Sequence, residues 1–211
     1  MKALFLPDYP FDTLFIPHIL KEIYFDDIYR PALNKKGKDL VAIDAGANIG
    51  LVTQFLRPFA RKIYAIEPSP EHYQCLLANK AFNQWDNVEC FDLALSDLNG
   101  WTGLNRFNVN RTCNSTVFNR DTSDTVTVKT IRLDTFLEDN KIEHVDLLKL
   151  DIEGAEELVL RDFASVAPKI DMIHVEFHTR NPTDMAEYLR TLGYECARIN
   201  TRVVAYLFWK E

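Results

Sequence analysis

Four residues in the first quarter of the chain form a motif in which a carboxylate is followed by a loop of small residues. They are spaced as Asp-x-Gly-x-Asn-x-Gly: Asp44, Gly46, Asn48 and Gly50. A short apolar run, residues 40–43, precedes them, and a helical pattern follows. A strand, a glycine loop and a helix in this order hold a ligand at the start of the helix. The segment therefore predicts a small-molecule site, and a tight turn without a ligand is the alternative.

The positions of the glycines discriminate between nucleotides. A dinucleotide-binding loop needs G-x-G-x-x-G, but the second and third positions are Asn48 and Leu51 here. This disfavours NAD, FAD and a nicotinamide oxidoreductase. An acidic residue, then Gly, then Gly or Asn, then Gly at alternate positions is the form of the S-adenosylmethionine loop in Rossmann-like methyltransferases. We expect Asp44 to attract the ammonium of that cofactor and the loop N–H groups to hold its carboxylate.

Two further segments are expected to complete the cofactor site. Glu67 ends the second expected strand, 21 residues after Gly46, where an acidic residue accepts hydrogen bonds from ribose hydroxyls. Ser96 and Asp97 follow the third expected strand and are predicted to build the adenine pocket. For Asp97 the alternative is a capping role in the turn that ends at Gly100.

A second polar group follows two other apolar runs. Asp151 and Glu153 come after residues 147–150, and Glu176 and His178 end a later run. Residues two apart in a strand face one side, and ligands bind beyond the carboxyl ends of the strands in open parallel sheets. We expect these residues to activate an acceptor, with His178, Glu176 or Asp151 as general base. The alternative is that Asp151, Glu153 and Glu176 bind Mg²⁺.

Two neighbours of this group are expected to have structural roles. Glu156 is predicted to favour the start of the next helix through the helix dipole. His174 is predicted to be a core or supporting histidine rather than a catalyst.

The elements that position these residues alternate along the chain. We predict a helix over residues 14–30, and then strands separated by helices, which is typical of a parallel, doubly wound α/β sheet. The expected strands are 40–43, 63–66, within 88–95, 145–150, 172–178, 194–199 and 203–208. Residues 101–130 are predicted to form an inserted β-hairpin. Its polar residues are candidates for a substrate wall, and a solvated hairpin is the alternative: Arg106, Arg111, Asn114, Ser115 and Arg120.

Length and charge narrow the function classes. The chain has 211 residues and a formal charge of −7, from 24 basic and 31 acidic residues. This size predicts one domain, and the acidic balance argues against nucleic acid or an anionic membrane as partner. The scattered cysteines suit a reducing compartment. We find neither a signal peptide nor a membrane span, so a cytoplasmic location is expected.

The motifs together resemble the FkbM-type methyltransferase family. They are D-x-G-A-N-I-G, I-Y-A-I-E-P, A-L-S-D-x-x-G, L-D-T-F, D-L-L-K-L-D-I-E-G-A-E and H-V-E-F-H, in family order over residues 39–178. The K-x-D-x-E-G-A-E segment is the most specific. The resemblance implies a class I, three-layer Rossmann-like fold over residues 39–211, with a helical leader over 1–38. It also implies a seven-stranded, mostly parallel sheet whose last strand is antiparallel.

The resemblance further implies O-methylation, with S-adenosylmethionine as cofactor. Asp44, Gly46, Asn48, Gly50 and Glu67 would bind the cofactor, whereas Asp151 and Glu153 would face the transferred methyl group. We therefore expect an O-methyltransferase for a small, polar, sugar-like or natural-product acceptor with a hydroxyl group. The alternatives are N-methylation on the same fold and a subunit that binds the cofactor without catalysis. Nitrogen methylation often uses a motif such as N-P-P-Y after the fourth strand, and that place here holds Asp151 to Gly154.

Overall fold

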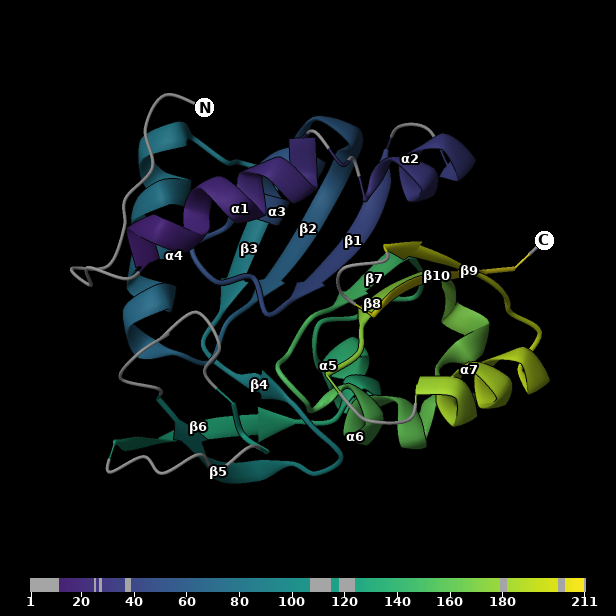
Figure 1. Cartoon of the computed structure of the whole chain (residues 1–211). Coiled ribbons are helices and arrows are strands. Elements are labelled where there is room, and N and C mark those ends of the chain that lie inside the picture. Colours follow the sequence, from purple (N-terminus) through teal and green to yellow (C-terminus); the bar gives the residue numbers. More distant parts are fainter. Residues whose placement is uncertain are drawn as a thin grey trace.

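The main sheet has seven strands in the order β3-β2-β1-β7-β8-β10-β9 (Figure 1). The computed structural model describes residues 12–24, 26, 28–36, 39–106, 115–117, 124–178, 182–200 and 204–210. The strands of the main sheet are β1 (Leu40–Ala45), β2 (Ala60–Ile66), β3 (Val88–Phe91), β7 (Val145–Leu150), β8 (Ile170–Glu176), β9 (Glu195–Asn200) and β10 (Ala205–Trp209). Strands β3, β2, β1, β7 and β8 run parallel, and β10 is antiparallel to both of its neighbours. This confirms the expected Rossmann-like α/β fold.

Helices cover both faces of this sheet. They are α1 (Asp12–Tyr24), α2 (Arg30–Lys36), α3 (Leu51–Leu56), α4 (Pro70–Asn83), α5 (Leu133–Asp139), α6 (Glu156–Arg161) and α7 (Pro182–Thr191). Figure 1 shows α5, α6 and α7 gathered on one side of the sheet, and α1 and α3 on the other. Because successive strand residues point to opposite faces, each buried strand contributes to two separate cores.

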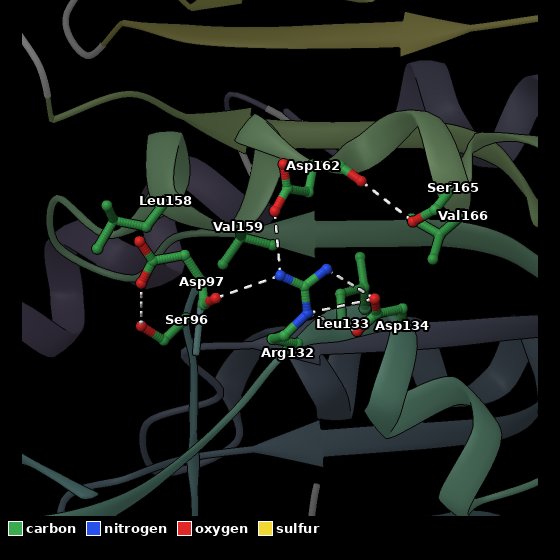
Figure 2. A pocket seen from close by; sticks show the side chains of 10 residues that line it. All are labelled: Ser96, Asp97, Arg132, Leu133, Asp134, Leu158, Val159, Asp162, Ser165 and Val166. Carbon is green, nitrogen blue, oxygen red and sulfur yellow. Dashed lines mark hydrogen bonds and ion pairs between the residues drawn. The ribbon is translucent and has the colours of Figure 1, made fainter. Parts of the chain in front are cut away.

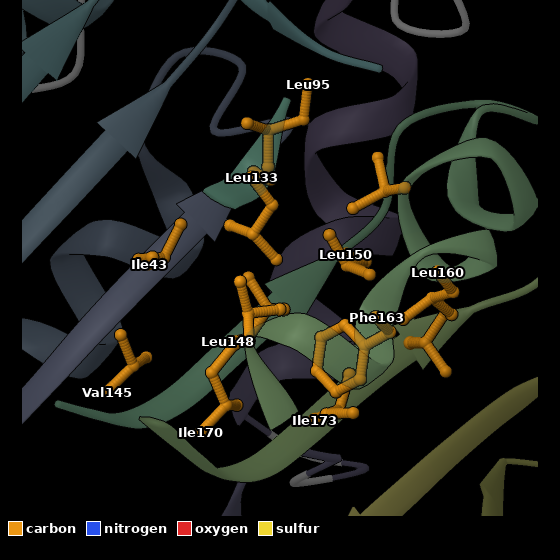
Figure 3. Close-up of a cluster of buried hydrophobic side chains, with 14 of the residues drawn as sticks. Ile43, Leu95, Leu133, Val145, Leu148, Leu150, Leu160, Phe163, Ile170 and Ile173 are labelled. Carbon is orange, nitrogen blue, oxygen red and sulfur yellow. The ribbon is translucent and has the colours of Figure 1, made fainter. Parts of the chain in front are cut away.

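The two cores differ in what they pack against the sheet. Ile43, Leu148 and Ile173 belong to the cluster beneath α5, α6 and α7, which is drawn in Figure 3. Ala42 and Leu147, at neighbouring positions of the same strands, belong to the cluster on the side of α1, α2 and α3. None of the described helices is long and apolar enough to cross a membrane.

The N-terminal helix was predicted to be continuous over residues 14–30, and this was wrong. Helix α1 ends at Tyr24, and α2 begins at Arg30, with Pro31 as its second residue. Proline favours the first turn of a new helix and interrupts an existing one. The apolar spacing did not reveal the break, because Ile23, Ile28 and Tyr29 are all buried in one core.

The third predicted strand, within residues 88–95, is divided between two sheets. Strand β3 is an edge strand of the main sheet, and β4 (Ala94–Leu95) pairs with β6 (Thr125–Ile131) in a second sheet of order β4-β6-β5. Strand β5 (Gly100–Asn105) pairs antiparallel with β6, as expected for the inserted hairpin. The insert is therefore a three-stranded sheet rather than a two-stranded hairpin, because β4 adds a parallel strand to it.

The carboxyl ends of the parallel strands bring distant loops together. Strand β1 pairs with both β2 and β7, and β7 pairs with β8. The segments that follow these four strands therefore lie along one edge of the sheet, where ligands bind in this class of fold. These segments contain most of the candidate site residues.

Candidate active site

The glycine loop, residues 44–50, turns sharply out of β1 into α3. Gly46, Asn48 and Gly50 have left-handed backbone conformations, with φ of 75°, 52° and 93°. A Cβ at Gly50 would lie 2.8 Å from Leu76 and 2.9 Å from Trp85. A side chain at Gly50 would therefore be excluded by both conformation and packing.

The backbone N–H groups of the loop are bonded within the protein. Those of Gly46 and Ala47 donate to the carbonyl oxygen of Ile66 at 3.0 and 2.9 Å, and that of Gly50 donates to the carbonyl oxygen of Ala47 at 2.8 Å. The N–H of Asn48 donates to Glu67, and that of the next residue donates to the Asn48 side chain. Each of these groups thus has an acceptor within the protein, and their role toward a ligand carboxylate stays a prediction.

Glu67 lies buried directly behind this loop. Its Oε2 accepts the Asn48 N–H at 2.8 Å, and its Oε1 accepts the Ser69 N–H at 2.9 Å. Burial raises the pKa of Glu67 to about 7, and the two backbone hydrogen bonds and the positive charge of Lys149 oppose this rise. Each carboxylate oxygen has a second lone pair. Glu67 can therefore accept hydrogen bonds from a ligand diol while it holds the loop.

Asp44 is placed differently from the expectation. Its side chain is completely buried. Thr53 Oγ1 donates to Asp44 Oδ2 at 2.6 Å, and Lys149 Nζ lies 3.1 Å from Asp44 Oδ1. Asp44 therefore pairs with an internal lysine, and its attraction of a ligand ammonium, directly or through water, stays a prediction.

The second polar group is brought together as predicted. The imidazole of His178 lies among the carboxylates that end β7 and β8: its Nε2 is 4.0 Å from Asp151 Oδ1, 3.5 Å from Glu153 Oε2 and 3.6 Å from Glu176 Oε1. The side chains of Glu153, Glu176 and His178 are each about one-fifth exposed, and that of Asp151 is about one-third exposed. The strand ends thus form a partly open acidic cluster.

Glu156 is a site residue whose role sequence reasoning missed. Its fully buried carboxylate accepts the N–H groups of Ile152 and Gly154, and its Oε1 lies 3.0 Å from His178 Nδ1. It is the first residue of α6, so its expected place at a helix start is correct. It additionally orients His178, with Nε2 toward the three other carboxylates. The signal was present in the K-x-D-x-E-G-A-E segment, which contains both Lys149 and Glu156.

The surroundings of His178 and Glu176 shift their pKa values. Burial disfavours the charged form of His178, but the hydrogen bond to Glu156 and the charges of Glu153, Asp151 and Glu156 outweigh it and raise the pKa to about 10. Burial and the charge of Asp151 raise the pKa of Glu176, and His178 opposes this. The raised pKa favours the cationic form of His178 at neutral pH, and it therefore favours the carboxylates over His178 as general base.

The pH dependence of stability tests this assignment. The folded pKa of His178 lies above its usual value of 6.5, so its stabilisation is fully present below pH 6.5 and is lost as pH rises through 10. We expect the free energy of unfolding, measured in urea, to fall by roughly 1–3 kcal/mol more between pH 6.5 and 10 in the wild type than in His178→Gln, given its partial exposure. His144→Gln, at a half-exposed histidine beside Asp146 and Asp171, is the matched control. Equal pH dependence in wild type and His178→Gln would contradict the assignment.

His174 is a core histidine, as expected. It is buried, and its ring lies against that of Tyr29 with centroids 4.3 Å apart. Burial and the charge of Lys149 lower its pKa to about 3. The neutral imidazole therefore has a packing role beneath the site.

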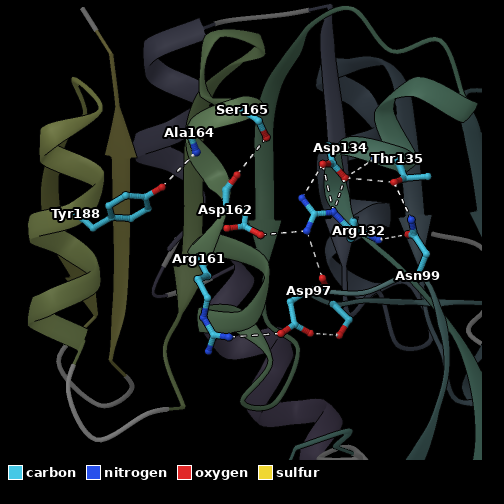
Figure 4. A network of polar contacts seen from close by, with 11 residues as sticks. Asp97, Asn99, Arg132, Asp134, Thr135, Arg161, Asp162, Ala164, Ser165 and Tyr188 are labelled. Carbon is cyan, nitrogen blue, oxygen red and sulfur yellow. Dashed lines mark hydrogen bonds and ion pairs between the residues drawn. The ribbon is translucent and has the colours of Figure 1, made fainter.

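Ser96 and Asp97 line a separate small hollow, shown in Figure 2. Asp97 interacts with Ser96 and, at 3.5 Å, with Arg161, while its carbonyl oxygen accepts a hydrogen bond from Arg132. Arg132 also binds Asp134 and Asp162, and Figure 4 shows these contacts as one network between α5 and α6. Asp97 is therefore held by arginines, and its role toward adenine remains a prediction.

The insert approaches the acidic cluster through Ser115. Its hydroxyl donates to the carbonyl oxygen of Glu153 at 2.6 Å, and its backbone pairs with Asn105 of β5. Arg106, a candidate for anion binding, instead forms ion pairs with Glu71 and Asp124. The other candidates of the predicted substrate wall, Arg111, Asn114 and Arg120, lie outside the described residues.

The arrangement also bears on Mg²⁺. Ligand atoms of Asp151, Glu153 and His178 lie within 4.8 Å of one another. This group differs from the predicted set of Mg²⁺ ligands, which contained Glu176 in place of His178. His178 already balances part of the negative charge there as a cation. The arrangement can act without a metal ion: it offers a carboxylate to remove a proton and a buried acid to hold a diol.

Comparisons with known proteins identify a family for the chain. The family model described as "Methyltransferase FkbM domain" matches residues 44–196. "Methyltransferase sdnD" of Sordaria araneosa is 33% identical over 177 residues, covering 68% of this chain and 67% of that protein. "Hexuronic acid methyltransferase AglP" of Haloferax volcanii is 25% identical over 178 residues, covering 82% and 72%.

Solved structures show the same fold. "Methyltransferase FkbM" from Methylobacillus flagellatus KT is similar with a TM-score of 0.55 at 15% identity, over 81% of this chain. This chain spans 43% of that longer chain. The methyltransferase domain titled "METTL16 MTase domain" gives a TM-score of 0.57 at 14% identity, over 90% of this chain and 67% of that one.

Proposed function

This chain belongs to the FkbM family of methyltransferases, and on that premise we propose that it transfers a methyl group from S-adenosylmethionine to a hydroxyl oxygen of a small, polar, sugar-like acceptor. The observation that carries the proposal is the edge of the sheet where the glycine loop, Glu67 and the acidic cluster meet. A relative whose name is hexuronic acid methyltransferase supports a sugar-like acceptor.

The chemistry of this edge fits a cationic nucleoside. The two cations at this edge are Lys149 and His178. They are outnumbered by the carboxyl groups, which are Asp44, Glu67, Asp151, Glu153, Glu156 and Glu176. A negative potential attracts a ligand that carries a sulfonium and an ammonium. We assign the ribose hydroxyls to Glu67, and the cationic centre to the side of Asp151 and Glu153. S-adenosylmethionine supplies an electrophilic methyl group when bound.

Residues in and around the acidic cluster are assigned to the alignment and deprotonation of the acceptor. The protein must align the acceptor oxygen and remove its proton. Among the partly open carboxyl groups, Glu176 has a raised pKa, and a base works best when its pKa lies near the working pH. We therefore assign the acceptor proton to Glu176. His178, oriented by Glu156, places its charge among the carboxylates of the cluster, and Ser115 places the insert beside Glu153.

Isothermal titration with S-adenosylmethionine and S-adenosylhomocysteine tests the cofactor. We expect micromolar binding by the wild type, and binding at least about tenfold weaker in Glu67→Ala, equivalent to about 1.4 kcal/mol. The weakening follows from the loss of the ribose acceptor and of the bond to the Asn48 N–H. Glu89→Ala is the matched control, since Glu89 is half-exposed on β3 and pairs with Lys62. A folded wild type that binds neither compound would reject the proposal.

The acceptor class is tested by a panel of sugars and other hydroxyl compounds beside amines of similar size. We expect S-adenosylhomocysteine to form with the hydroxyl compounds. Turnover with amines alone would reject O-methylation and leave the cofactor assignment in place.

A further inference from the structure

Lys149 is a buried cation between two leucines of β7. Its side chain is 1% exposed, although it lies between Leu148 and Leu150 in β7. An ammonium withdrawn from water is costly unless it is paired and hydrogen-bonded. The contacts of Lys149 therefore indicate what this residue does.

These contacts join two segments that are about one hundred residues apart in sequence. Lys149 Nζ donates to the carbonyl oxygens of Gly46 at 2.8 Å and Ala45 at 3.2 Å, and it lies 3.1 Å from Asp44 Oδ1. Asp151 Oδ2 lies 3.6 Å from the same nitrogen. One ammonium thus links the glycine loop to the first carboxylate of the acidic cluster.

The backbones of the two segments also touch. The N–H of Asp151 donates to the carbonyl oxygen of Ala45 at 3.3 Å, and a Cβ at Gly46 would lie 1.8 Å from the carbonyl oxygen of Asp151. Asp44 is fixed from its other side by Thr53. The loop that is assigned to the cofactor and the cluster that is assigned to the acceptor therefore meet around the Asp44–Lys149 pair.

We propose that Lys149 is a positioning residue: through its charge pair with Asp44 it fixes the glycine loop relative to Asp151, so that donor and acceptor are held by one unit. This inference rests on the proposed function, which assigns the glycine loop to the cofactor and the acidic cluster to the acceptor. A misplacement of about 1 Å can lower the rate about a hundredfold. A rigid link between the glycine loop and Asp151 therefore favours methyl transfer.

The charge state of the pair supports this role. Burial lowers the pKa of Lys149, but Asp44, Asp151 and Glu176 outweigh it and raise the pKa to about 12. The titratable groups that face Lys149 come from β1, β8 and the segments that follow β2 and β7, and they are Asp44, Asp151, His174, Glu176 and Glu67. Lys149 is thus charged at every working pH, and removing it leaves Asp44 as an unpaired buried carboxylate.

A double-mutant cycle tests the charge pair. We expect Lys149→Met to bind S-adenosylmethionine at least about tenfold more weakly than the wild type at pH 8. Lys149→Met combined with Asp44→Asn removes both charges and is expected to recover at least about threefold of the lost affinity. A deficit that is unchanged in the double variant would overturn the proposal.

Hydrogen exchange separates this proposal from the cofactor assignment. We expect Lys149→Met to exchange faster than the wild type in both segments, residues 46–50 and 151–154, and at an unchanged rate in β9. This readout needs no cofactor, so it decides the role of Lys149 even if the wild type fails to bind S-adenosylmethionine. If only the double variant folds, the charge pair is supported. If neither variant folds, or if exchange rises in one segment alone, the proposal is wrong.

Discussion

Glu176→Gln is expected to lower the turnover of methyl transfer by about 10²–10⁴-fold, the usual contribution of a general base. The affinity for S-adenosylmethionine is expected to change by less than about threefold, because the change lies on the acceptor side of the site. Glutamine keeps the size of the side chain but does not take up a proton at neutral pH. The measurement is formation of S-adenosylhomocysteine with an acceptor from the panel, together with titration of the cofactor.

The pH profile adds a second readout for Glu176. A base must be deprotonated to act, so wild-type turnover should rise with pH as Glu176, whose pKa is raised by burial, loses its proton. Glu176→Gln should lose this rise along with most of its activity. Glu187→Gln, on an exposed glutamate of α7, is the matched control. Wild-type turnover by Glu176→Gln would remove this residue as the base and direct attention to Asp151.

Gly46→Ala is expected to destabilise the fold by at least about 3 kcal/mol and to abolish cofactor binding. Gly46 has a φ of 75°, and its missing Cβ would lie 1.8 Å from the carbonyl oxygen of Asp151. Alanine therefore suffers both a strained backbone and a backbone clash, and the glycine loop has to move away from β7. Urea unfolding and titration with S-adenosylmethionine measure the two effects.

Gly193→Ala separates conformational strain from the clash. Gly193 has a similar φ of 88°, but nothing lies within 4 Å of its missing Cβ. We expect it to lose only about 1–2 kcal/mol, the cost of a left-handed conformation for an L-residue, and to bind the cofactor normally. Equal losses in the two variants would show that close packing of the glycine loop against Asp151 contributes nothing.

The main sheet and the residues at its edge could be predicted from the sequence because their signals are local. A buried parallel strand is indicated by a short apolar run, and polar residues occur at or directly after the carboxyl ends of β1, β2, β7 and β8. Since the carboxyl ends of parallel strands share one edge, the proximity of Asp151, Glu153, Glu176 and His178 follows from the order of the elements. The break between α1 and α2 and the division of β3 from β4 leave the apolar spacing unchanged, so that spacing alone did not reveal them.

The partners of individual charges are decided by the tertiary structure alone. The sequence places Asp44 at the end of a strand, but only the packing of β7 against β1 puts Lys149 beside it. The sequence makes Arg106 a candidate for binding an anion, but in the fold it forms ion pairs with Glu71 and Asp124. Likewise, the sequence makes His178 a candidate base near neutral pH. In the fold, Glu156 and the neighbouring carboxylates raise its pKa and stabilise its cationic form.

Strand order and local motifs in the sequence specify the α/β fold, the family and the edge of the sheet that holds the candidate site. The tertiary structure decided which carboxyl groups are open and which are neutralised within the protein. The physical reason is that a pKa depends on burial and on charges a few ångströms away in space, and Lys149 and Glu156 reach Asp44 and His178 only when the chain is folded.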